Sequence, residues 1–364
     1  MVDKELLYGT LKKYFGYDSF REGQEELITN TLQGKDVLGI MPTSGGKSLC
    51  YQLPALLLDG MTIVVSPLVS LMKDQVDSLR EMGIAAAYLN STLSREEFLQ
   101  LMDDMRSGQL KLLYIAPERI DNESFMNALR FVNVPLLVVD EAHCISQWGS
   151  DFRPSYQGVA RLYDVFGRRP RVAAFTATAT EPVQDDIMIQ LRLQQPFRLV
   201  TGFDRSNLAF SVEKPADKFK FLVKDLNPKE ASIIYCSTRK NVESVQKKLE
   251  QKGFAVTLYH AGLPEHERQR NQDDFLFDRK PIMVATNAFG MGIDKSNVRT
   301  VYHYNMPKNI ESYYQEAGRA GRDGEEARVI LLFSTQDIII NQLLNSKTND
   351  SEATNKLNKM INYC

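Results

Sequence analysis

A glycine-rich stretch near the N-terminus, "MPTSGGKSLCYQ" (41–52), contains residues that could bind the phosphates of a nucleotide. The strict phosphate-loop pattern G-x-x-x-x-G-K-[ST] fails at its first position, Met41, but ends intact with Gly46, Lys47 and Ser48. In such a loop the lysine reaches the β- and γ-phosphates, and the hydroxyl that follows it ligates Mg²⁺. The alternative is an ordinary glycine-rich turn, so the rest of the chain must supply the other parts of a nucleotide site.

The predicted secondary structure around this loop supports the nucleotide interpretation. "DVLGIM" is a short apolar run that predicts a buried strand, and "KSLCYQLPALLL" predicts an apolar helix that opens at Gly46 or Lys47. A helix N-terminus carries roughly half a positive charge, and the N–H groups before it can turn toward a phosphate. The order strand, glycine loop and helix is therefore the arrangement that phosphate binding requires.

Two adjacent carboxylates, Asp140 and Glu141, follow the apolar run "PLLVV". In open parallel sheets, ligands bind at the edge formed by the carboxyl ends of the strands. There, Asp140 could hold Mg²⁺ through water, and Glu141 could orient and deprotonate an attacking water molecule. The alternative is an acidic pair that solvates a loop or caps a helix, but the Gly-Lys-Ser loop favours the nucleotide site. His143 and Gln147 follow closely, and each alone is also typical of an ordinary hydrogen-bonded polar residue.

The stretch "YYQEAGRAGRDG" could present arginines to a phosphate. If it is helical, Gln315, Arg319 and Arg322 fall at i, i+4 and i+7, on one face. Gly318 and Gly321 would each cost about 1 kcal/mol in a helix, so a helix end or the close approach of another body must account for them. Arginines facing a γ-phosphate would act as arginine fingers. The alternative, a solvated basic face, is disfavoured by the two glycines.

Aromatic and guanidinium groups gather in "QWGSDFRP", a few residues past the carboxylates. Trp148, Phe152 and Arg153 could stack on nucleic-acid bases, at about 1–3 kcal/mol per base. The alternative is a core tryptophan, which is the commoner role of this residue. Because the surrounding Gly, Ser, Asp and Pro residues predict a loop, we expect Trp148 to be exposed.

Three threonines follow another predicted strand, in "FTATATEPVQDD". Thr180 precedes Glu-Pro and predicts a helix N-cap. Capping accounts for Thr180 and leaves Thr176 and Thr178 to link a nucleotide site to bound nucleic acid.

A polar cluster lies before the first strand, in "YDSFREGQEE". Tyr17 could stack on adenine, the Gln24 amide could pair with the edge of that base, and Arg21 could support both. Without the other motifs, the same residues would be interpreted as packing.

Length and composition bound the possible functions. A chain of 364 residues suggests two or three domains, and its net charge of −2 restricts nucleic-acid contacts to local grooves. No run of 18 apolar residues predicts a membrane span, and the N-terminus is a charged amphipathic helix rather than a signal peptide. The four cysteines form no C-x-x-C pair, which argues for a reducing cytoplasm and against a zinc site.

Short apolar strands alternate with helical segments along the chain, which predicts parallel α/β sheets. The predicted strands are "DVLGIM", "MTIVVS", "AAAYLN", "KLLYIA", "PLLVVD" and "RVAAFT", followed by "ASIIYCS", "AVTLYHA", "PIMVAT", "TVYHYNM" and "ARVILLF". The alternation pauses at "RLVTGFDRSNLAF", so we place a domain boundary near Gly202. The polar stretch "SKTNDSEATNKLNK" predicts an exposed connector.

Together, these stretches resemble the RecQ family of superfamily 2 DNA helicases over nearly the whole chain. The matching motifs are "FREGQ", "GGKS", "SPLVSLMKDQ", "YIAPER", "DEAHCISQWGSDFRP", "TATAT", "YHAGL", "ATNAFGMGID" and "QEAGRAGRDG". The motif "DEAHCISQWGSDFRP" is highly specific, because it joins the carboxylates to the family's aromatic-rich loop. The family usually has glycine at the position of Ser44, where a left-handed backbone would strain a serine by roughly 1–2 kcal/mol.

The resemblance implies an α/β fold with two RecA-like domains, each a mostly parallel sheet flanked by helices, and ATP in the cleft between them. It places the domains at 1–202 and 203–345, with 346–364 as a connector and the start of a zinc-binding module. Since the family continues into that module and a winged helix, the chain resembles a truncated helicase core. We therefore expect no zinc here, and Cys364 is not interpreted as a ligand.

The resemblance also assigns roles by motif. It assigns ATP binding to Tyr17, Arg21, Gln24, Thr43, Ser44, Gly45, Gly46, Lys47 and Ser48, and Mg²⁺ to Ser48 and Asp140. It assigns catalysis to Lys47, Glu141 as the base, Gln315, Arg319 and Arg322, the last as the arginine finger. It assigns DNA contact and its coupling to hydrolysis to Ser66, Gln147, Trp148, Phe152, Arg153, Thr176 and Thr178.

The implied activity is DNA-stimulated ATP hydrolysis that drives 3′ to 5′ translocation on single-stranded DNA and duplex unwinding, in DNA repair and recombination. The implied partners are single-stranded and duplex DNA, for a monomer in the bacterial cytoplasm or nucleoid. A single-stranded-DNA-binding protein is compatible with a full-length form. Two alternatives remain. One is an ATP-gated DNA clamp with little unwinding, which intact Lys47, Glu141 and Arg322 disfavour. The other is an RNA helicase of the same superfamily, which the aromatic-rich loop disfavours.

Overall fold

The chain divides into two compact units, Met1–Phe203 (unit 1) and Asp204–Cys364 (unit 2). The computed structural model describes residues 2–42, 45–89, 93–147, 151–202, 205–289, 295–345 and 351–364. Of the predicted site residues, Thr43, Ser44 and Trp148 lie outside these ranges. None of the described helices is long and apolar enough to span a membrane.

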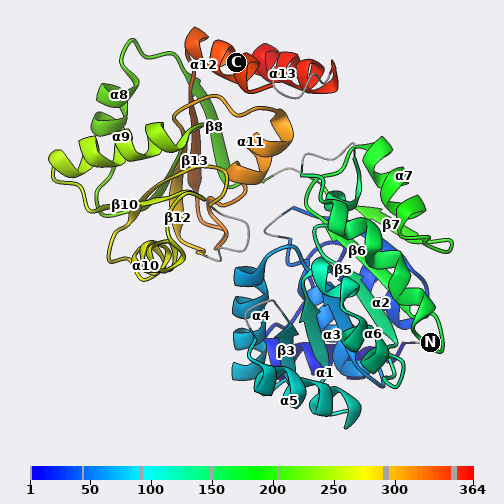
Figure 1. The fold of residues 1–364 in the computed structure, drawn as a ribbon. Helices are drawn as coiled ribbons and strands as arrows, with labels where there is room; N and C mark the ends of the chain where they lie inside the picture. Colours follow the sequence, from blue (N-terminus) through cyan, green and yellow to red (C-terminus); the bar gives the residue numbers. More distant parts are fainter. Residues whose placement is uncertain are drawn as a thin grey trace. The chain divides into compact units, whose positions relative to one another are not determined.

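Unit 1 is built on a sheet of seven parallel strands in the order β3-β4-β2-β5-β6-β1-β7 (Figure 1). Its strands are β1 (Val37–Ile40), β2 (Thr62–Val65), β3 (Ala86–Leu89), β4 (Leu112–Ile115), β5 (Leu136–Val139), β6 (Arg171–Thr176) and β7 (Phe197–Val200). Its helices are α1 (Lys4–Thr10), α2 (Gln24–Leu32), α3 (Leu49–Leu57), α4 (Val69–Glu81), α5 (Arg95–Arg106), α6 (Glu123–Leu129) and α7 (Glu181–Gln190). Short helices of other types are η1 (Leu11–Phe15), η2 (Pro117–Asp121), η3 (Ala142–Ile145) and η4 (Pro154–Asp164).

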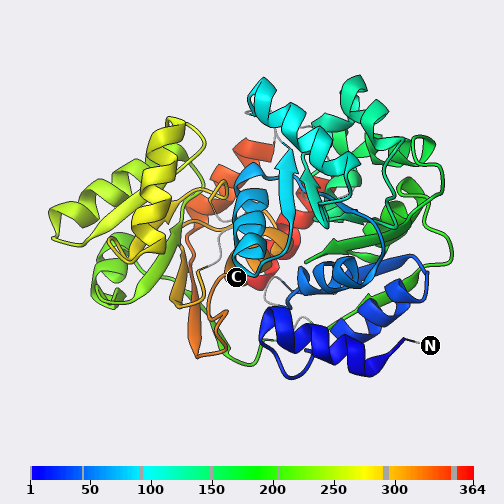
Figure 2. The ribbon, with the colours of Figure 1, turned by 90° about the horizontal axis from the view of Figure 1, so that it is seen from below.

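Apart from the edge strand β7, the strands of unit 1 are largely buried on both faces because helices cover each side of the sheet. Alternate strand residues divide between two cores: Leu38 and Ile63 pack with α5, α6 and α7, whereas Val37 and Val64 pack with α1 to α4. At the N-terminus, dark blue in Figure 2, α1 is tied to α2 because the Tyr8 hydroxyl donates to the Glu25 carboxylate at 2.8 Å. Burial on both faces is the reason that these strands are continuous apolar runs in the sequence.

Unit 2 is built on a sheet of six parallel strands in the order β10-β11-β9-β12-β13-β8. Its strands are β8 (Leu208–Glu213), β9 (Ala231–Tyr235), β10 (Val256–Tyr259), β11 (Ile282–Ala285), β12 (Val298–His303) and β13 (Ala327–Leu332). Its helices are α8 (Lys218–Asp225), α9 (Arg239–Gln251), α10 (Glu265–Leu276), α11 (Ile310–Ala317), α12 (Thr335–Asn345) and α13 (Ser351–Tyr363). The predicted parallel α/β architecture is thus confirmed, and all eleven predicted strands are present.

Two strands around residues 198–210 were not predicted, but strands and helices do stop alternating there, because no helix among the described residues separates β7 from β8. β7 ends inside this stretch and β8 begins in it, and each is the outermost strand of its sheet. The exposed and half-buried residues of β7 alternate, and β8 is also largely uncovered. Edge strands of this kind lack the continuous apolar run that identified the central strands.

The connector predicted at 346–359 is helical from Ser351, where α13 begins. Positions 354, 355, 358 and 359 are exposed, as predicted, whereas Leu357 is buried. Leu357 and Met360 are buried in the core of unit 2. Figure 1 shows α13 beside α12. These apolar residues are three apart among polar ones, which is the spacing of one helix face.

Candidate functional site

The glycine loop of unit 1 leaves β1 at the carboxyl edge of the sheet. Helix α3 begins at Leu49, with Ser48 as its N-cap, two or three residues later than predicted. Gly46 has a left-handed backbone (φ +70°), and a side chain there would collide with the Gln24 amide. The Gln24 amide nitrogen donates to the carbonyls of Gly45 (3.1 Å) and Gly46 (3.2 Å). Gln24 therefore holds the glycine loop through hydrogen bonds to residues more than twenty positions away in the sequence.

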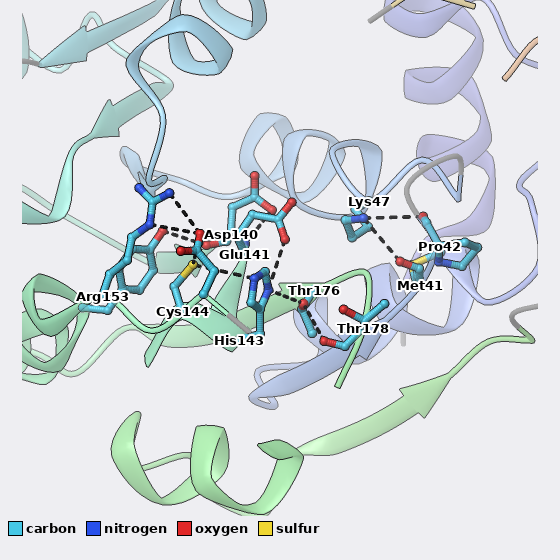
Figure 3. A network of polar contacts seen from close by, with 12 residues as sticks. Met41, Pro42, Lys47, Asp140, Glu141, His143, Cys144, Arg153, Thr176 and Thr178 are labelled. Carbon is cyan, nitrogen blue, oxygen red and sulfur yellow. Dashed lines mark hydrogen bonds and ion pairs between the residues drawn. The ribbon is translucent and has the colours of Figure 1, made fainter. Parts of the chain in front are cut away.

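Lys47 is buried within the loop, with an exposed fraction of 9%. Its ammonium donates to the carbonyl oxygens of Met41 at 3.3 Å and Pro42 at 3.5 Å (Figure 3). Both distances are long for charge-assisted hydrogen bonds, which are typically about 2.7–2.9 Å. The ammonium is therefore weakly held by the backbone and can exchange these carbonyls for phosphate oxygens.

Asp140 and Glu141 follow β5 at the same carboxyl edge of the sheet. Asp140 is 7% exposed. Its carboxylate accepts the Glu141 N–H at 3.0 Å, and its carbonyl accepts the Tyr156 hydroxyl at 3.0 Å. Burial, followed by the charge of Glu141, raises the pKa of Asp140 to about 7, while Lys47 acts in the opposite direction. A buried carboxylate beside a second carboxylate is a centre of negative charge that a cation would stabilise.

Glu141 has a left-handed backbone (φ 48°, ψ 46°). A non-glycine residue in this region is strained, and such strain clusters at functional sites. Its carboxylate Oε2 lies 3.3 Å from Nδ1 of His143, which is buried. The strain and the histidine together fix where the Glu141 carboxylate lies.

His143 also joins the carboxylates to the end of β6. Its Nδ1 lies 2.8 Å from the hydroxyl oxygen of Thr176, and that hydroxyl donates to the Thr178 carbonyl at 3.3 Å (Figure 3). Thr176 is fully buried, whereas Thr178 is half-buried. Thr180 is the N-cap of α7, as predicted, but its side chain makes no capping hydrogen bond.

Of the predicted adenine residues, Tyr17 is 55% exposed, Arg21 is exposed and Gln24 is buried. The Gln24 carbonyl oxygen accepts the backbone N–H of Arg21 at 2.8 Å. Both ends of the Gln24 amide thus contact the backbone, so the structure adds a positioning role to the predicted contact with the base.

The predicted DNA-coupling residues fall around the loop that precedes η4. Arg153 donates to the Pro67 carbonyl at 2.8 Å and to the Asp151 carboxylate at 3.0 Å. Gln147 is exposed, Phe152 is half-buried and Ser66 is buried. The sequence interpretation missed Pro67 and Asp151. Asp151 could have been found from the sequence, because it lies two residues before Arg153. The contact between Arg153 and Pro67 joins distant parts of the chain, so the sequence contains no signal for it.

Gln315, Arg319 and Arg322 would share one helical face only if their segment were helical throughout. It is not, because α11 ends at Ala317. Gln315 lies in the helix, whereas Arg319 and Arg322 follow its end. Arg319 is buried, and Arg322 is half-buried. Burial raises the pKa of the Tyr235 phenol to about 12, while a hydrogen bond with Arg319 acts in the opposite direction.

The sequence offers two explanations for Gly318 and Gly321, a helix end and the close approach of another group, and the structure shows one at each glycine. Gly318 caps α11, and Gly321 has a left-handed backbone (φ +56°). A side chain on Gly321 would meet Asn207 at 2.5 Å and the Glu325 carbonyl at 2.7 Å. The Gly321 carbonyl accepts from Arg205 at 2.7 Å and from Asn207 at 2.9 Å. The left-handed backbone and the close approach therefore require glycine at Gly321, whereas Gly318 has a right-handed backbone (φ −62°) that does not.

Comparison with known proteins identifies the family. A family model for DEAD/DEAH box helicases matches residues 21–186, and one for the helicase conserved C-terminal domain matches residues 217–324. The chain is 48% identical to the ATP-dependent DNA helicase RecQ of Bacillus subtilis, over 97% of this chain and 61% of that protein. It is 41% identical to the probable ATP-dependent DNA helicase RecS of the same organism, over 91% of this chain and 67% of that protein. The chain belongs to the RecQ family of DNA helicases.

Among solved structures, this RecQ-family chain is similar to the DUF1998 helicase MrfA bound to DNA. The TM-score is 0.76 at 21% identity, and the match covers 96% of this chain and 54% of that one. With the two matched helicase domains, this likeness confirms the predicted pair of RecA-like domains with parallel sheets flanked by helices. The chain spans between 53% and 61% of the length of three RecQ relatives.

Proposed function

We propose that this chain is the ATP-hydrolysing core of a RecQ-type DNA helicase, stimulated by single-stranded DNA. The observation that carries the proposal is the placement of Lys47, Asp140 and Glu141 at one carboxyl edge of the unit 1 sheet, in a chain of the RecQ family. Family membership supports translocation in the 3′ to 5′ direction and a role in DNA repair and recombination. The domain limits 1–202 and 203–345 form part of this proposal.

The donor set fits ATP with Mg²⁺. Lys47 would neutralise charge on the β- and γ-phosphates, and the Ser48 hydroxyl with the Asp140 carboxylate would hold Mg²⁺. Mg²⁺ held there would supply positive charge that offsets the negative charge developing on the phosphates. The buried Asp140–Glu141 pair fits this role, because a cation offsets both the burial of the Asp140 carboxylate and its repulsion by Glu141, which together raise its pKa.

Glu141 is the proposed general base. Its carboxylate would accept the proton of the attacking water, while His143 holds its Oε2. The chain His143–Thr176–Thr178 extends from this base to the segment after β6, a route by which contact with DNA could reposition the carboxylate. Ser66, Gln147, Trp148, Phe152 and Arg153 would supply the DNA contacts.

Tyr17, Arg21 and Gln24 would bind the adenine, and the loop residues Thr43, Ser44, Gly45 and Gly46 the phosphates. From unit 2, Arg322 is the proposed arginine finger, and Gln315 and Arg319 support it. The partial exposure of Arg322 supports this choice over Arg319, which is buried within its own unit.

The test is the ATPase rate of the chain without nucleic acid, with single-stranded DNA and with RNA. Stimulation by DNA over RNA is expected, with weak, salt-sensitive DNA binding, because phosphate contacts set the salt slope and the chain carries a net charge of −2. A rate that does not respond to DNA would favour the ATP-gated clamp, and stimulation by RNA alone would favour an RNA helicase.

A further inference from the structure

Three side chains of types that can ligate a metal ion converge beside the proposed base. They are His143 and Cys144, both buried, and Asp151, which is half-buried. One donor atom from each lies within 4.8 Å of the other two. Sγ of Cys144 is 3.8 Å from Nε2 of His143 (Figure 3). It is 3.9 Å from Oδ2 of Asp151.

These separations approach those within a zinc site. Zinc binds sulfur at about 2.3 Å, imidazole nitrogen at about 2.0–2.1 Å and carboxylate oxygen at about 2.0–2.2 Å. Two ligands of a tetrahedral ion at such distances lie roughly 3.5 Å apart. The sulfur-to-nitrogen and sulfur-to-oxygen distances of 3.8 Å and 3.9 Å therefore need only small side-chain movements to enclose an ion.

The hydrogen bonds of His143 fix which ring nitrogen is available. The Thr176 hydroxyl donates its proton to the Thr178 carbonyl, so its oxygen can accept from Nδ1–H of His143. The Glu141 carboxylate, 3.3 Å from the same Nδ1, also accepts only. The proton therefore belongs on Nδ1, and Nε2 presents its lone pair beside Cys144. A zinc-ligating histidine usually donates its other ring N–H to an oxygen acceptor, and Nδ1 of His143 lies 2.8 Å from the Thr176 hydroxyl oxygen.

The local charge also favours a cation. Asp140 and Glu141 add negative charge beside the cluster, and the guanidinium of Arg153 adds positive charge. Arg153 contacts the same Oδ2 of Asp151, and a carboxylate oxygen can accept more than one partner.

We propose that His143, Cys144 and Asp151 form a reversible binding site for Zn²⁺, with a solvent molecule as the fourth ligand. The half-exposed Asp151 carboxylate is its entrance. Soft thiolate and imidazole ligands select Zn²⁺ over Mg²⁺, so the site is distinct from the one at Ser48 and Asp140. Because His143 also contacts Glu141, occupancy is expected to slow ATP hydrolysis. This consequence rests on the proposed function, whereas the binding itself does not.

The binding test uses Co²⁺, which replaces Zn²⁺ and gives a sulfur-to-metal absorption band when bound to thiolate. One equivalent of Co²⁺ should produce the band, Zn²⁺ should remove it, and excess Mg²⁺ should leave it in place. Cys144→Ser should abolish the band. Cys364→Ser is the matched control, because Cys364 is the most exposed of the four cysteines, and it should retain the band.

Asp151→Asn provides a second variant, at a partly exposed position. It should weaken Zn²⁺ binding by more than about 10-fold, in competition with a colorimetric chelator. The proposal is overturned if no sulfur band forms, if the band survives Cys144→Ser, or if Asp151→Asn binds Zn²⁺ as tightly as the parent. Zinc inhibition of the ATPase that persists in Cys144→Ser would overturn the inhibitory role alone.

Discussion

Nδ1 of His143 and the hydroxyl oxygen of Thr176 lie 2.8 Å apart, which joins the loop after β5 to the end of β6. The same nitrogen lies 3.3 Å from the Glu141 carboxylate. A residue that the sequence left as an ordinary polar side chain thus connects the proposed base to the proposed coupling segment.

Thr176→Val should loosen this connection without disturbing nucleotide binding. Valine removes the hydroxyl and keeps the shape of the side chain. The loss of one hydrogen bond of about 1 kcal/mol should lower kcat about 5-fold. The KM for ATP should stay unchanged. Thr180→Val is the matched control, because its side chain makes no capping hydrogen bond. Equal losses in the two variants would remove Thr176 from the mechanism.

Glu141→Gln should separate ATP binding from turnover. Binding depends on Lys47 and the glycine loop, whereas Glu141 acts on the attacking water, so kcat should fall by about 10²–10⁴ while ATP affinity is retained. Equilibrium binding of a fluorescent ATP analogue and steady-state turnover measure the two quantities. Parallel loss of affinity and turnover would contradict the role of general base.

Arg322→Ala should reduce turnover, whereas Arg319→Ala should reduce stability. Arg322 is partly exposed, so its loss should lower kcat by about 10³–10⁵ with little change in thermal stability, as for an arginine finger. Arg319 is buried and hydrogen-bonded to Tyr235, so its loss should lower the free energy of unfolding by about 1–3 kcal/mol. Thermal melts measure the change in stability, and ATPase assays measure the change in kcat, for each variant. A stable Arg322→Ala variant with full turnover would exclude that arginine as the finger.

Trp148→Ala should lower the ratio of DNA-stimulated to basal hydrolysis. The indole is proposed to stack on a base, an interaction of about 1–3 kcal/mol. Activity titrations with single-stranded DNA measure the ratio, and a thermal melt serves as the control. Joint collapse of basal hydrolysis and thermal stability would show instead that Trp148 is a core residue.

Sequence alone determined the parts of this protein that depend on neighbours along the chain. The runs that became β1 and β5 are apolar at every position because both faces of these strands are buried. The glycine loop and the carboxylates directly follow these strands, so a parallel sheet necessarily brings them to one edge. The fold class and the core of the site were therefore predictable. The edge strands β7 and β8 were missed, because partial exposure removes the continuous apolar pattern.

Tertiary structure decided which distant groups meet. Gln24 clamps Gly45 and Gly46, and His143 bonds Thr176, across 21 to 33 residues of chain. The absence of a C-x-x-C pair argued against zinc, yet folding places Asp151 beside Cys144. Such contacts depend on how loops leave a sheet and which backbone groups they approach. Neither composition nor periodicity encodes these distances, because both describe only the order of residues along the chain.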